Sequence, residues 1–353
     1  MSDRQLTELG FYTLAGAAES PRDLIDEIRM GEELGLGSVF ISERFDKKEA
    51  LTVTGAVGAV SERLNIITGV TNHNLRHPMV TAGHASTMHL LTEGRFTLGL
   101  GRGFDARSRA YGLDPITTAQ MEDFADLMRR LWHGETVVGH EGPAGSWPAL
   151  RLNTAFDLDI PMAIAAFGPN TLELAGRAFD HVILHTFFTD ETLQRCVKTV
   201  KDSAERAGRD PASVIVWSVI ATVGDWIDPG LRLKKTVGRM GTYLQAYGDL
   251  MVSTNRWDPA QLTAFREHDF VKNFAGSIDA VATTSDLEII AEAMPEEWLA
   301  PAAYGSAEQC ATEAKRQLSL GADAVILHGA TPTELAPILA AYRAQAAPSD
   351  ATA

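Results

Sequence analysis

The chain has 353 residues, of which 45% are apolar and 22% are charged, as is usual for a globular protein. Its 46 acidic and 31 basic residues give a formal net charge of −15 at pH 7. Because no basic block offsets this charge, the composition excludes a general nucleic-acid binder and a protein that binds anionic membrane surfaces. It still permits a local basic pocket for an anionic cofactor.

Cysteine usage and hydropathy predict a cytoplasmic protein. The two cysteines, Cys196 and Cys310, cannot form a disulfide framework, which fits a reducing compartment. Residues 1–4 carry no apolar signal core. The longest nearly apolar stretch, residues 160–167, is far too short to cross a bilayer.

Short apolar runs alternate with helical patterns along the chain. The expected strands are 7–13, 38–42, 64–69, 95–100, 161–166, 181–185, 213–220 and 323–328. The expected helices are 21–34, 47–60, 78–91, 118–131, 169–178, 191–207, 306–320 and a last one that begins after Thr331. This alternation predicts an α/β protein with a parallel (β/α)₈ TIM barrel, and the alternative is an open doubly wound sheet.

Helix starts and two insertions complete this outline. Ser20 precedes Pro21 as an N-cap, and capping boxes are expected at Thr117 and Thr331. Residues 134–159 are rich in Gly, Pro and Trp and are expected to form a hairpin or loop after strand four. Residues 223–305 form a long insertion after strand seven, of the kind that builds lids or partner surfaces. We expect one barrel domain over residues 1–353.

In a barrel of this kind the chemistry lies at the carboxyl ends of the strands. This rule selects a set of polar and aromatic residues that follow the expected strands. They are Tyr12, Glu43, Arg44, Asn72, His73, Asn74, Arg102, Phe104, Asp105, Phe167, Gly168, His185 and His328.

Three stretches at these strand ends carry a more specific signal. Residues 68–78 read TGVTNHNLRHP, residues 93–103 read EGRFTLGLGRG, and residues 165–176 read AAFGPNTLELAG. Together and in this order they resemble the luciferase-like superfamily of flavin and deazaflavin oxidoreductases. Within it they look most like coenzyme F420-dependent enzymes of the methylenetetrahydromethanopterin reductase type. The resemblance extends from about residue 9 to residue 329.

The third stretch contains a site suited to an anionic cofactor tail. Gly168, Pro169, Asn170 and Thr171 open a helix directly after a strand and after Phe167. Free backbone N–H groups and the helix dipole favour a phosphate there, although an ordinary strand-to-helix turn has the same outline. Arg102, like its neighbours Arg107 and Arg109, is expected either to meet an anionic tail or to be solvated.

The resemblance assigns the first stretch to the deazaflavin ring. It implies a non-prolyl cis peptide bond between Gly69 and Val70, in a bulge behind the ring, where Gly69 as a plain strand terminator is the alternative. It also implies that Thr71 and Asn72 supply donors and acceptors near the ring edge.

Two positions depart from the pattern of the similar F420 enzymes. An acidic residue at the end of strand two is commonly followed by His, but here Glu43 is followed by Arg44. A carboxylate is usual where this chain has Phe104, so a sugar-phosphate dehydrogenase activity is not expected. Glu43 is the acid or base of choice, and an ion pair with Arg44 or Arg76 is the structural alternative.

Three histidines complete the expected site. His73 is proposed to share proton handling with Glu43, while His185 and His328 end strands and are expected, with Phe104, to contact substrate. No metal is expected, because His73 and His77 lack a third ligand.

The resemblance implies hydride transfer between F420 and a small organic substrate, in a protein that forms a homodimer. One alternative is an FMN-dependent monooxygenase on the same barrel. Another, from a different class, is a deazaflavin carrier without catalysis. A barrel lyase or aldolase is less favoured, since no strand-end Lys suggests a Schiff base.

Overall fold

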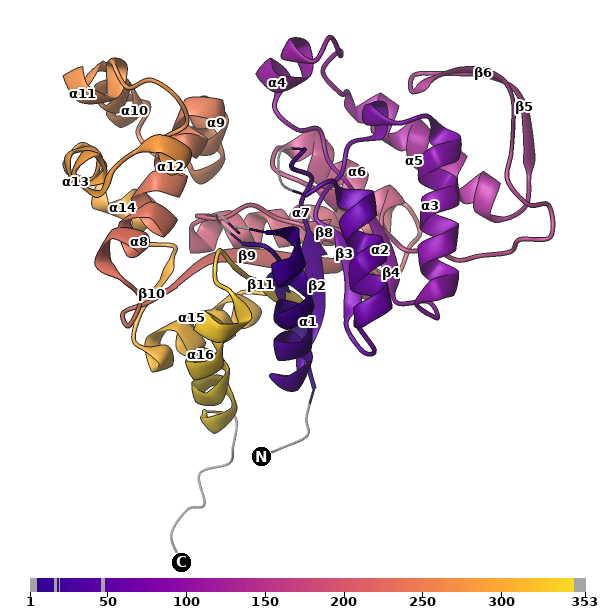
Figure 1. The fold of residues 1–353 in the computed structure, drawn as a ribbon. Helices are drawn as coiled ribbons and strands as arrows, with labels where there is room; N and C mark the ends of the chain where they lie inside the picture. The colour runs from indigo at the N-terminus through magenta and orange to yellow at the C-terminus, as the bar shows by residue number, and fades with distance from the viewer. Residues whose placement is uncertain (1–4, 16–17, 19, 46–47, 346–353) are drawn as a thin grey trace, which may run out of the picture.

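The fold is that of a computed structural model, which describes residues 5–15, 18, 20–45 and 48–345 (Figure 1). Eight parallel strands close into a barrel: β1 (Leu6–Tyr12), β2 (Leu36–Ile41), β3 (Asn65–Thr68), β4 (Phe96–Leu100), β7 (Met162–Ala165), β8 (His181–Ile183), β9 (Ile215–Gly224) and β11 (Ala324–His328). Neighbouring strands pair in parallel, and the pairing of β8 with β9 completes the ring. The predicted TIM barrel is therefore confirmed, and the open-sheet alternative is excluded.

Helices surround the barrel in the order expected from the sequence. They are α1 (Leu24–Glu33), α2 (Ala50–Val60), α3 (Pro78–Leu91), α5 (Thr118–Trp132), α6 (Pro169–Ala178), α7 (Asp190–Arg206), α15 (Ala307–Ser319) and α16 (Pro332–Ala344), with a short α4 (Asp105–Ala110) after β4 (Figure 1). Ser20 is an N-cap, and Thr117 and Thr331 form capping boxes, as predicted. Ser20 also forms a capping box, with Asp23. One difference is that Ser20 caps a 3₁₀ turn, Pro21–Asp23, which leads into α1. The expected helix start at position 47 lies outside the described residues.

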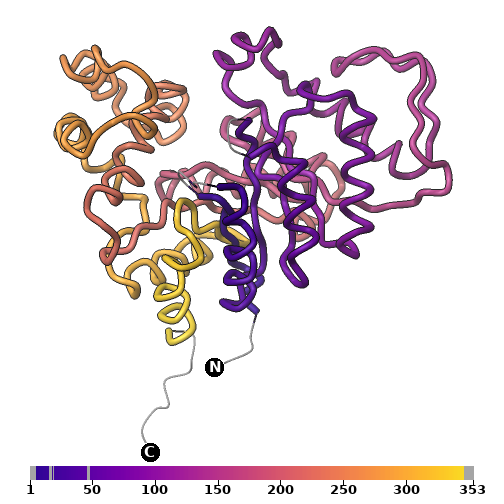
Figure 2. Tube along the Cα trace, in the orientation of Figure 1, coloured from indigo at the N-terminus to yellow at the C-terminus, as the bar shows by residue number. Residues whose placement is uncertain are grey.

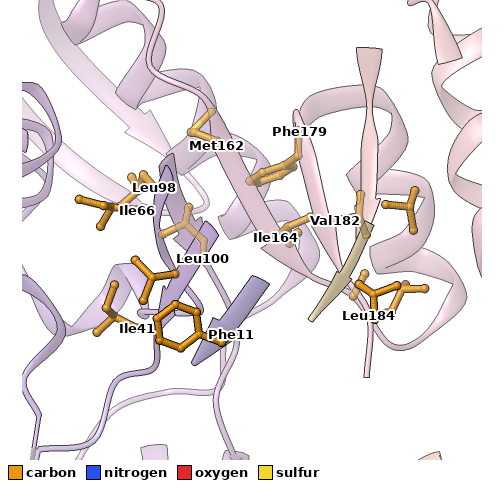
Figure 3. Close-up of a cluster of buried hydrophobic side chains, with 14 of the residues drawn as sticks. Phe11, Ile41, Ile66, Leu98, Leu100, Met162, Ile164, Phe179, Val182 and Leu184 are labelled. Atoms are coloured by element: carbon orange, nitrogen blue, oxygen red, sulfur yellow. The ribbon is translucent and has the colours of Figure 1, made fainter. Parts of the chain in front are cut away.

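Side chains of the barrel strands alternate between two apolar layers, as the two-residue period of a strand requires. Phe40, Trp217 and Ile326 belong to the interior of the barrel. Their neighbours Ile41 and Val216 pack instead with the surrounding helices. Figure 3 shows part of this outer layer, with strand residues such as Phe11 and Leu100 drawn as sticks. The filled interior leaves only the strand ends for a site.

Two insertions interrupt the repeat. The first contains an antiparallel hairpin, β5 (Thr136–Gly142) and β6 (Gly145–Arg151), as one of the two expected forms. The second carries α8 (Pro229–Leu233), a π-helical turn over Lys234–Gly238, α9 (Arg239–Asn255), α10 (Pro259–Glu267), α11 (Asp269–Lys272), α12 (Ile278–Val281), α13 (Thr284–Glu292) and α14 (Glu296–Leu299). Figure 2 shows these helices in orange beside the barrel. Within the described ranges, no helix is both long and apolar enough to cross a membrane.

The long insertion is shorter than residues 223–305, which the sequence suggests. Strand β9 continues to Gly224, and β10 (Ala303–Gly305) pairs with its last residues, Tyr304 opposite Val223. The insertion therefore leaves and rejoins the barrel through paired strands. Its helices bury their own apolar cluster, in which Trp257 and Trp298 stack with ring centroids 5.7 Å apart. The single-domain organisation stays a prediction.

Candidate functional site

Half-buried side chains occupy the carboxyl end of the barrel, which we call the barrel mouth. Tyr12 packs against the apolar interior, and His328 lies two residues beyond the interior residue Ile326. The rings of Tyr12 and His328 meet edge to face, with centroids 5.0 Å apart. Val70 and His185 are half-buried in the same region. These side chains therefore keep partial exposure at the barrel mouth.

The amino terminus of α6 and Arg102 form an open cradle, which we call the α6 cradle. Gly168 is the N-cap, Pro169 follows it, and no side chain caps the helix. A Cβ on Gly168 would meet nothing nearer than Leu250 Cδ1 at 4.0 Å, so space remains above the helix end. Pro169 has no N–H, and Thr171 N already donates to Gly168 O at 3.1 Å, so this turn offers an anion the N–H of Asn170 and the helix dipole. Asn170, the next residue of this turn, is exposed.

Arg102 adds a cation to this cradle. Its Nη2 donates to the Thr171 hydroxyl at 2.9 Å and also bonds the hydroxyl of Thr118. Its buried Nε has no hydrogen-bond partner in the described part of the chain. A buried donor without an acceptor is unfavourable, and an anionic ligand would supply one. Phe167, the residue before the cradle, packs its ring against that of His185, with centroids 4.7 Å apart.

The Gly69–Val70 peptide bond is cis, as the resemblance implies. The neighbouring backbone is held on both sides, since Gly69 N donates to Ile41 O at 2.7 Å and Glu43 N donates to Val70 O at 3.2 Å. Gly101 leaves room for this segment, because a Cβ there would lie 2.3 Å from Val70 Cγ2.

Thr71 and Asn72 are both anchored to the protein. The Thr71 hydroxyl donates to Glu43 Oε2 at 2.8 Å and accepts from Arg76 Nη1 at 2.9 Å. Asn72 Nδ2 donates to Gly101 O at 2.7 Å, which ties the segment after β3 to the end of β4. The Asn72 amide oxygen remains as an acceptor for a ligand.

Glu43 is bound on both of its oxygens and is a buried ion-pair residue. Oε1 accepts from Ala50 N at 2.9 Å, and Oε2 accepts from Arg76 Nη2 at 2.7 Å. The Glu43 side chain is only 5% exposed, so this pair is shielded from solvent. Arg76 also bonds Glu49, whose pKa lies near 2 because Thr52 and Arg76 stabilise the carboxylate. Of the two arginines expected as partners, the structure selects Arg76 over Arg44.

His73 is buried against a helix that surrounds the barrel. It begins a 3₁₀ turn, His73–Leu75, and its ring packs against Phe124 of α5 with centroids 5.2 Å apart. Burial lowers the pKa of His73 to about 4. His73 therefore packs with the apolar layer to which Phe124 belongs, and its role in proton transfer stays a prediction.

An aromatic cluster joins the barrel to the long insertion. His185 Nδ1 lies 3.0 Å from the Thr186 carbonyl oxygen, which only accepts, so Nδ1 carries the proton. Nε2 then accepts from the Tyr247 hydroxyl at 2.7 Å. Burial lowers the pKa of His185 to about 4 and raises the pKa of Tyr247. Phe104 stacks on Tyr247 with centroids 5.4 Å apart, so the loop after β4 also contacts α9.

His328 meets a cation from the insertion. Arg239 Nη1 lies 3.3 Å from His328 Nε2, and since arginine only donates, His328 is the acceptor. Burial, followed by the charge of Arg239, lowers the pKa of His328 well below its usual value. Lys48, which is also buried, donates from Nζ to the carbonyl oxygens of Thr13 and Leu14 at 3.0 and 2.9 Å.

The strand-end rule missed four residues of the barrel mouth: Lys48, Arg239, Tyr243 and Tyr247. Three of them, Arg239, Tyr243 and Tyr247, are spaced by four residues on α9. Such spacing places side chains on one helix face. This signal was present in the sequence, but only the folded insertion shows that the face meets the barrel.

Two other kinds of site receive no support. Among the described residues, no group of three His, Cys, Asp or Glu side chains could hold a metal. A cavity of about 330 Å³ at the opposite, amino-terminal end of the barrel is lined by Arg95 and Asp323 among others. Both are already bound, Arg95 to Leu64 O at 2.8 Å and Asp323 to Lys201 at 2.8 Å.

Comparisons with known proteins agree with this architecture. The chain is 27% identical over 343 residues to the F420-dependent glucose-6-phosphate dehydrogenase of Nocardia farcinica, covering 91% of each chain. It is 29% identical over 192 residues to the 5,10-methylenetetrahydromethanopterin reductase of Methanolobus tindarius, covering 53% of this chain and 57% of the relative. The structure of the coenzyme F420-dependent tetrahydromethanopterin reductase of Methanopyrus kandleri superposes with a TM-score of 0.76 at 17% identity, over 95% of this chain and 97% of that one. Residues 6–227 match the family model for luciferase-like monooxygenases. The chain belongs to this family, and it is a luciferase-like oxidoreductase.

Proposed function

We propose that the protein is a coenzyme F420-dependent oxidoreductase that transfers a hydride between the deazaflavin and a small organic substrate. The observation that carries a phosphate-bearing cofactor is the α6 cradle, where the buried Nε of Arg102 lacks a partner beside an uncapped helix start. The choice of F420 rests on the relatives, several of which are named for their dependence on F420.

The residues present fit such a cofactor. Arg102 and the first turn of α6, from Gly168 to Thr171, would hold its anionic tail. Val70 and Asn72, at the end of β3, would lie toward its ring, as the resemblance implies. When bound, the deazaflavin supplies the hydride donor or acceptor, and the protein supplies binding and orientation.

The proton that accompanies a hydride needs a donor or acceptor at the barrel mouth. Tyr12 keeps its proton, because burial raises the pKa of its hydroxyl. Tyr247 keeps its proton for the same reason and directs it toward His185 Nε2. We infer that Tyr12 and the His185–Tyr247 pair handle the proton, while Glu43 holds the segment after β3 through Arg76 and Thr71.

An FMN-dependent monooxygenase is the second candidate, favoured by the description of the family to which residues 6–227 belong. Fluorescence titration with F420 and with FMN in separate experiments distinguishes the two. We expect saturable quenching with F420 and weak or no binding of FMN. Tight FMN binding without F420 binding would overturn the proposal, and F420 binding without turnover of any tested substrate would favour the carrier.

A matched pair of variants tests the α6 cradle in the same titration. Arg102→Gln removes the cation with the unpaired Nε, so we expect F420 affinity to fall about tenfold, as for one charged hydrogen bond. Arg177→Gln is the control, because Arg177 lies in the last turn of α6, away from the helix start, and is bound by Glu122 at 2.7 Å through two nitrogens. Equal losses in both variants would remove Arg102 from the site. A homodimeric state and a cytoplasmic location stay predictions.

A further inference from the structure

Arg239 is a buried cation that lacks an acidic partner. It is only 9% exposed, and within the described residues it forms no ion pair with a carboxylate. Its Nη1 donates to the neutral His328 ring, and its buried Nε has no acceptor in the part of the chain that the structure describes. Buried charges in proteins are normally paired, so an uncompensated guanidinium at a barrel mouth indicates a missing anion.

His328 offers a second donor without an acceptor. Since its Nε2 accepts from Arg239, the ring proton lies on Nδ1, and this buried atom has no partner among the described residues. Tyr12 lies edge to face against the same ring. Two unpaired donors, one on the insertion and one on β11, therefore meet at the mouth.

Three basic side chains act on His328. The charges of Arg44, Lys48 and Arg239 all act on His328 and lower its pKa, together with its burial. Arg44 and Lys48 are joined through their backbones, with Lys48 N donating to Arg44 O at 2.7 Å. We call Arg44, Lys48 and Arg239 the basic cluster. Among the described residues, the charge of Glu27 acts on Lys48, but its carboxylate already accepts from the Thr13 hydroxyl at 2.7 Å. The charge of Asp279 acts, like that of Arg239, on Tyr247.

We propose that the substrate carries a carboxylate, which binds at the barrel mouth to Arg239 with His328 and the basic cluster around it. This inference rests on the proposed function and names the substrate class of that site. A planar carboxylate matches the flat guanidinium fork. A phosphate, which has more oxygens to satisfy, is less favoured because two of the three N–H donors of Lys48 already bind carbonyl oxygens.

Ligand-observed NMR and calorimetry with the purified full chain test this without turnover. The probes are pyruvate and benzoate, their uncharged methyl esters, and inorganic phosphate. We expect the acids to bind, and the esters and phosphate to bind at least about tenfold more weakly, as loss of one charged hydrogen bond predicts. Esters that bind as well as acids, or phosphate that binds better, would overturn the carboxylate assignment.

Variants locate the binding group. Arg239→Gln is expected to weaken pyruvate binding about tenfold or more, and Arg239→Lys, which keeps the charge but loses the fork, about threefold or more. The control is Lys234→Gln, which removes the same charge from the same insertion at a half-buried residue. Circular dichroism verifies that each variant folds. If Arg239→Gln does not fold, pyruvate binding by Arg239→Lys alone tests the role of Arg239. Unchanged binding in Arg239→Lys, or an equal loss in Lys234→Gln, would overturn the proposal.

The same samples are titrated with F420, so the two proposals fail separately. F420 binding with no discrimination of carboxylates would overturn this inference and leave the proposed function standing. Carboxylate binding that depends on Arg239, with no F420 binding, would overturn the proposed F420 dependence and leave the carboxylate site standing.

Discussion

The hydroxyl of Tyr247 donates a 2.7 Å hydrogen bond to Nε2 of His185 and thereby links the long insertion to the barrel. Tyr247 lies at a kink within α9, where the backbone leaves helical geometry. The kink brings its ring between Phe104, on the loop after β4, and Phe167, after β7. The insertion thus contributes a wall of the site as well as the cation Arg239.

Tyr247→Phe should weaken this link without removing the ring. His185 Nε2 loses its donor, so we expect the free energy of unfolding to fall by about 1–2 kcal/mol. Urea denaturation followed by circular dichroism measures the change. Tyr304→Phe is the control, because Tyr304 is 51% exposed, so removing its hydroxyl should change the free energy of unfolding little. Equal stability of the Tyr247 variant and the original chain would show that the hydrogen bond contributes nothing.

Glu43→Gln distinguishes an ion-pair residue from a proton-transfer group. The variant keeps the shape but removes the charge that pairs with Arg76, so we expect a loss of about 2–3 kcal/mol in unfolding free energy. Glu49→Gln, which removes the other carboxylate bound to Arg76, should cost less, because that side chain is 36% exposed.

The pH profile of catalysis gives the second readout for Glu43. If Glu43 serves through its ion pair, the pH optimum of Glu43→Gln matches that of the original chain once a substrate is known. Loss of one limb of the profile, with stability unchanged, would restore Glu43 as the acid or base.

The sequence was sufficient for the barrel and for the part of the site that follows from chain order. Short apolar runs predicted eight strands, and the residues after them, such as Gly168 and His328, lie at the barrel mouth as expected. The position of a residue after a strand does not, however, predict where its side chain packs. His73 follows β3 closely, but it lies in a 3₁₀ turn and packs its ring against Phe124, a contact that the strand end does not predict.

Contacts between distant segments could not be predicted from the sequence, for a different reason. Glu43 had two arginines, Arg44 and Arg76, as candidate partners, and the choice depends on where the chain after β3 turns. Arg239 reaches His328 from 89 residues away, through an insertion whose position is set by its own apolar cluster. Pattern and spacing describe a helix face, whereas packing determines what that face meets.

Acid should destabilise the protein as pH falls from about 6.5 toward 4. Burial lowers the pKa of His73, His84 and His185 to about 4 in the folded chain. The unfolded chain, with ordinary values near 6.5, therefore binds more protons in this window, and stability rises with pH across it. Above the window both states are neutral, and the effect vanishes.

A variant isolates one contribution to this acid sensitivity. His73→Leu fills the apolar layer with a side chain that cannot be protonated, so we expect its stability to fall less between pH 6.5 and 4 than that of the original chain. The measurement is the urea midpoint at several pH values. His268→Leu, at an exposed histidine, is the control. A parallel pH dependence of His73→Leu and the original chain would contradict the assignment of His73 to the interior.

Gly168→Val should separate cofactor binding from folding. The backbone at Gly168, with φ −93° and ψ 166°, is open to any residue, and a Cβ there has a nearest neighbour at 4.0 Å. We therefore expect a stability loss of no more than about 1 kcal/mol, the cost of a poor N-cap residue. A bulky side chain would nevertheless fill the space above the helix start where an anionic tail is proposed to bind, and we expect F420 affinity to fall about tenfold or more. Gly55→Val on α2, where a Cβ also meets nothing within 4 Å, is the matched control and should bind F420 normally. Normal F420 affinity in Gly168→Val would mean that the tail binds elsewhere, since no ligand phosphate could share that space with a valine side chain.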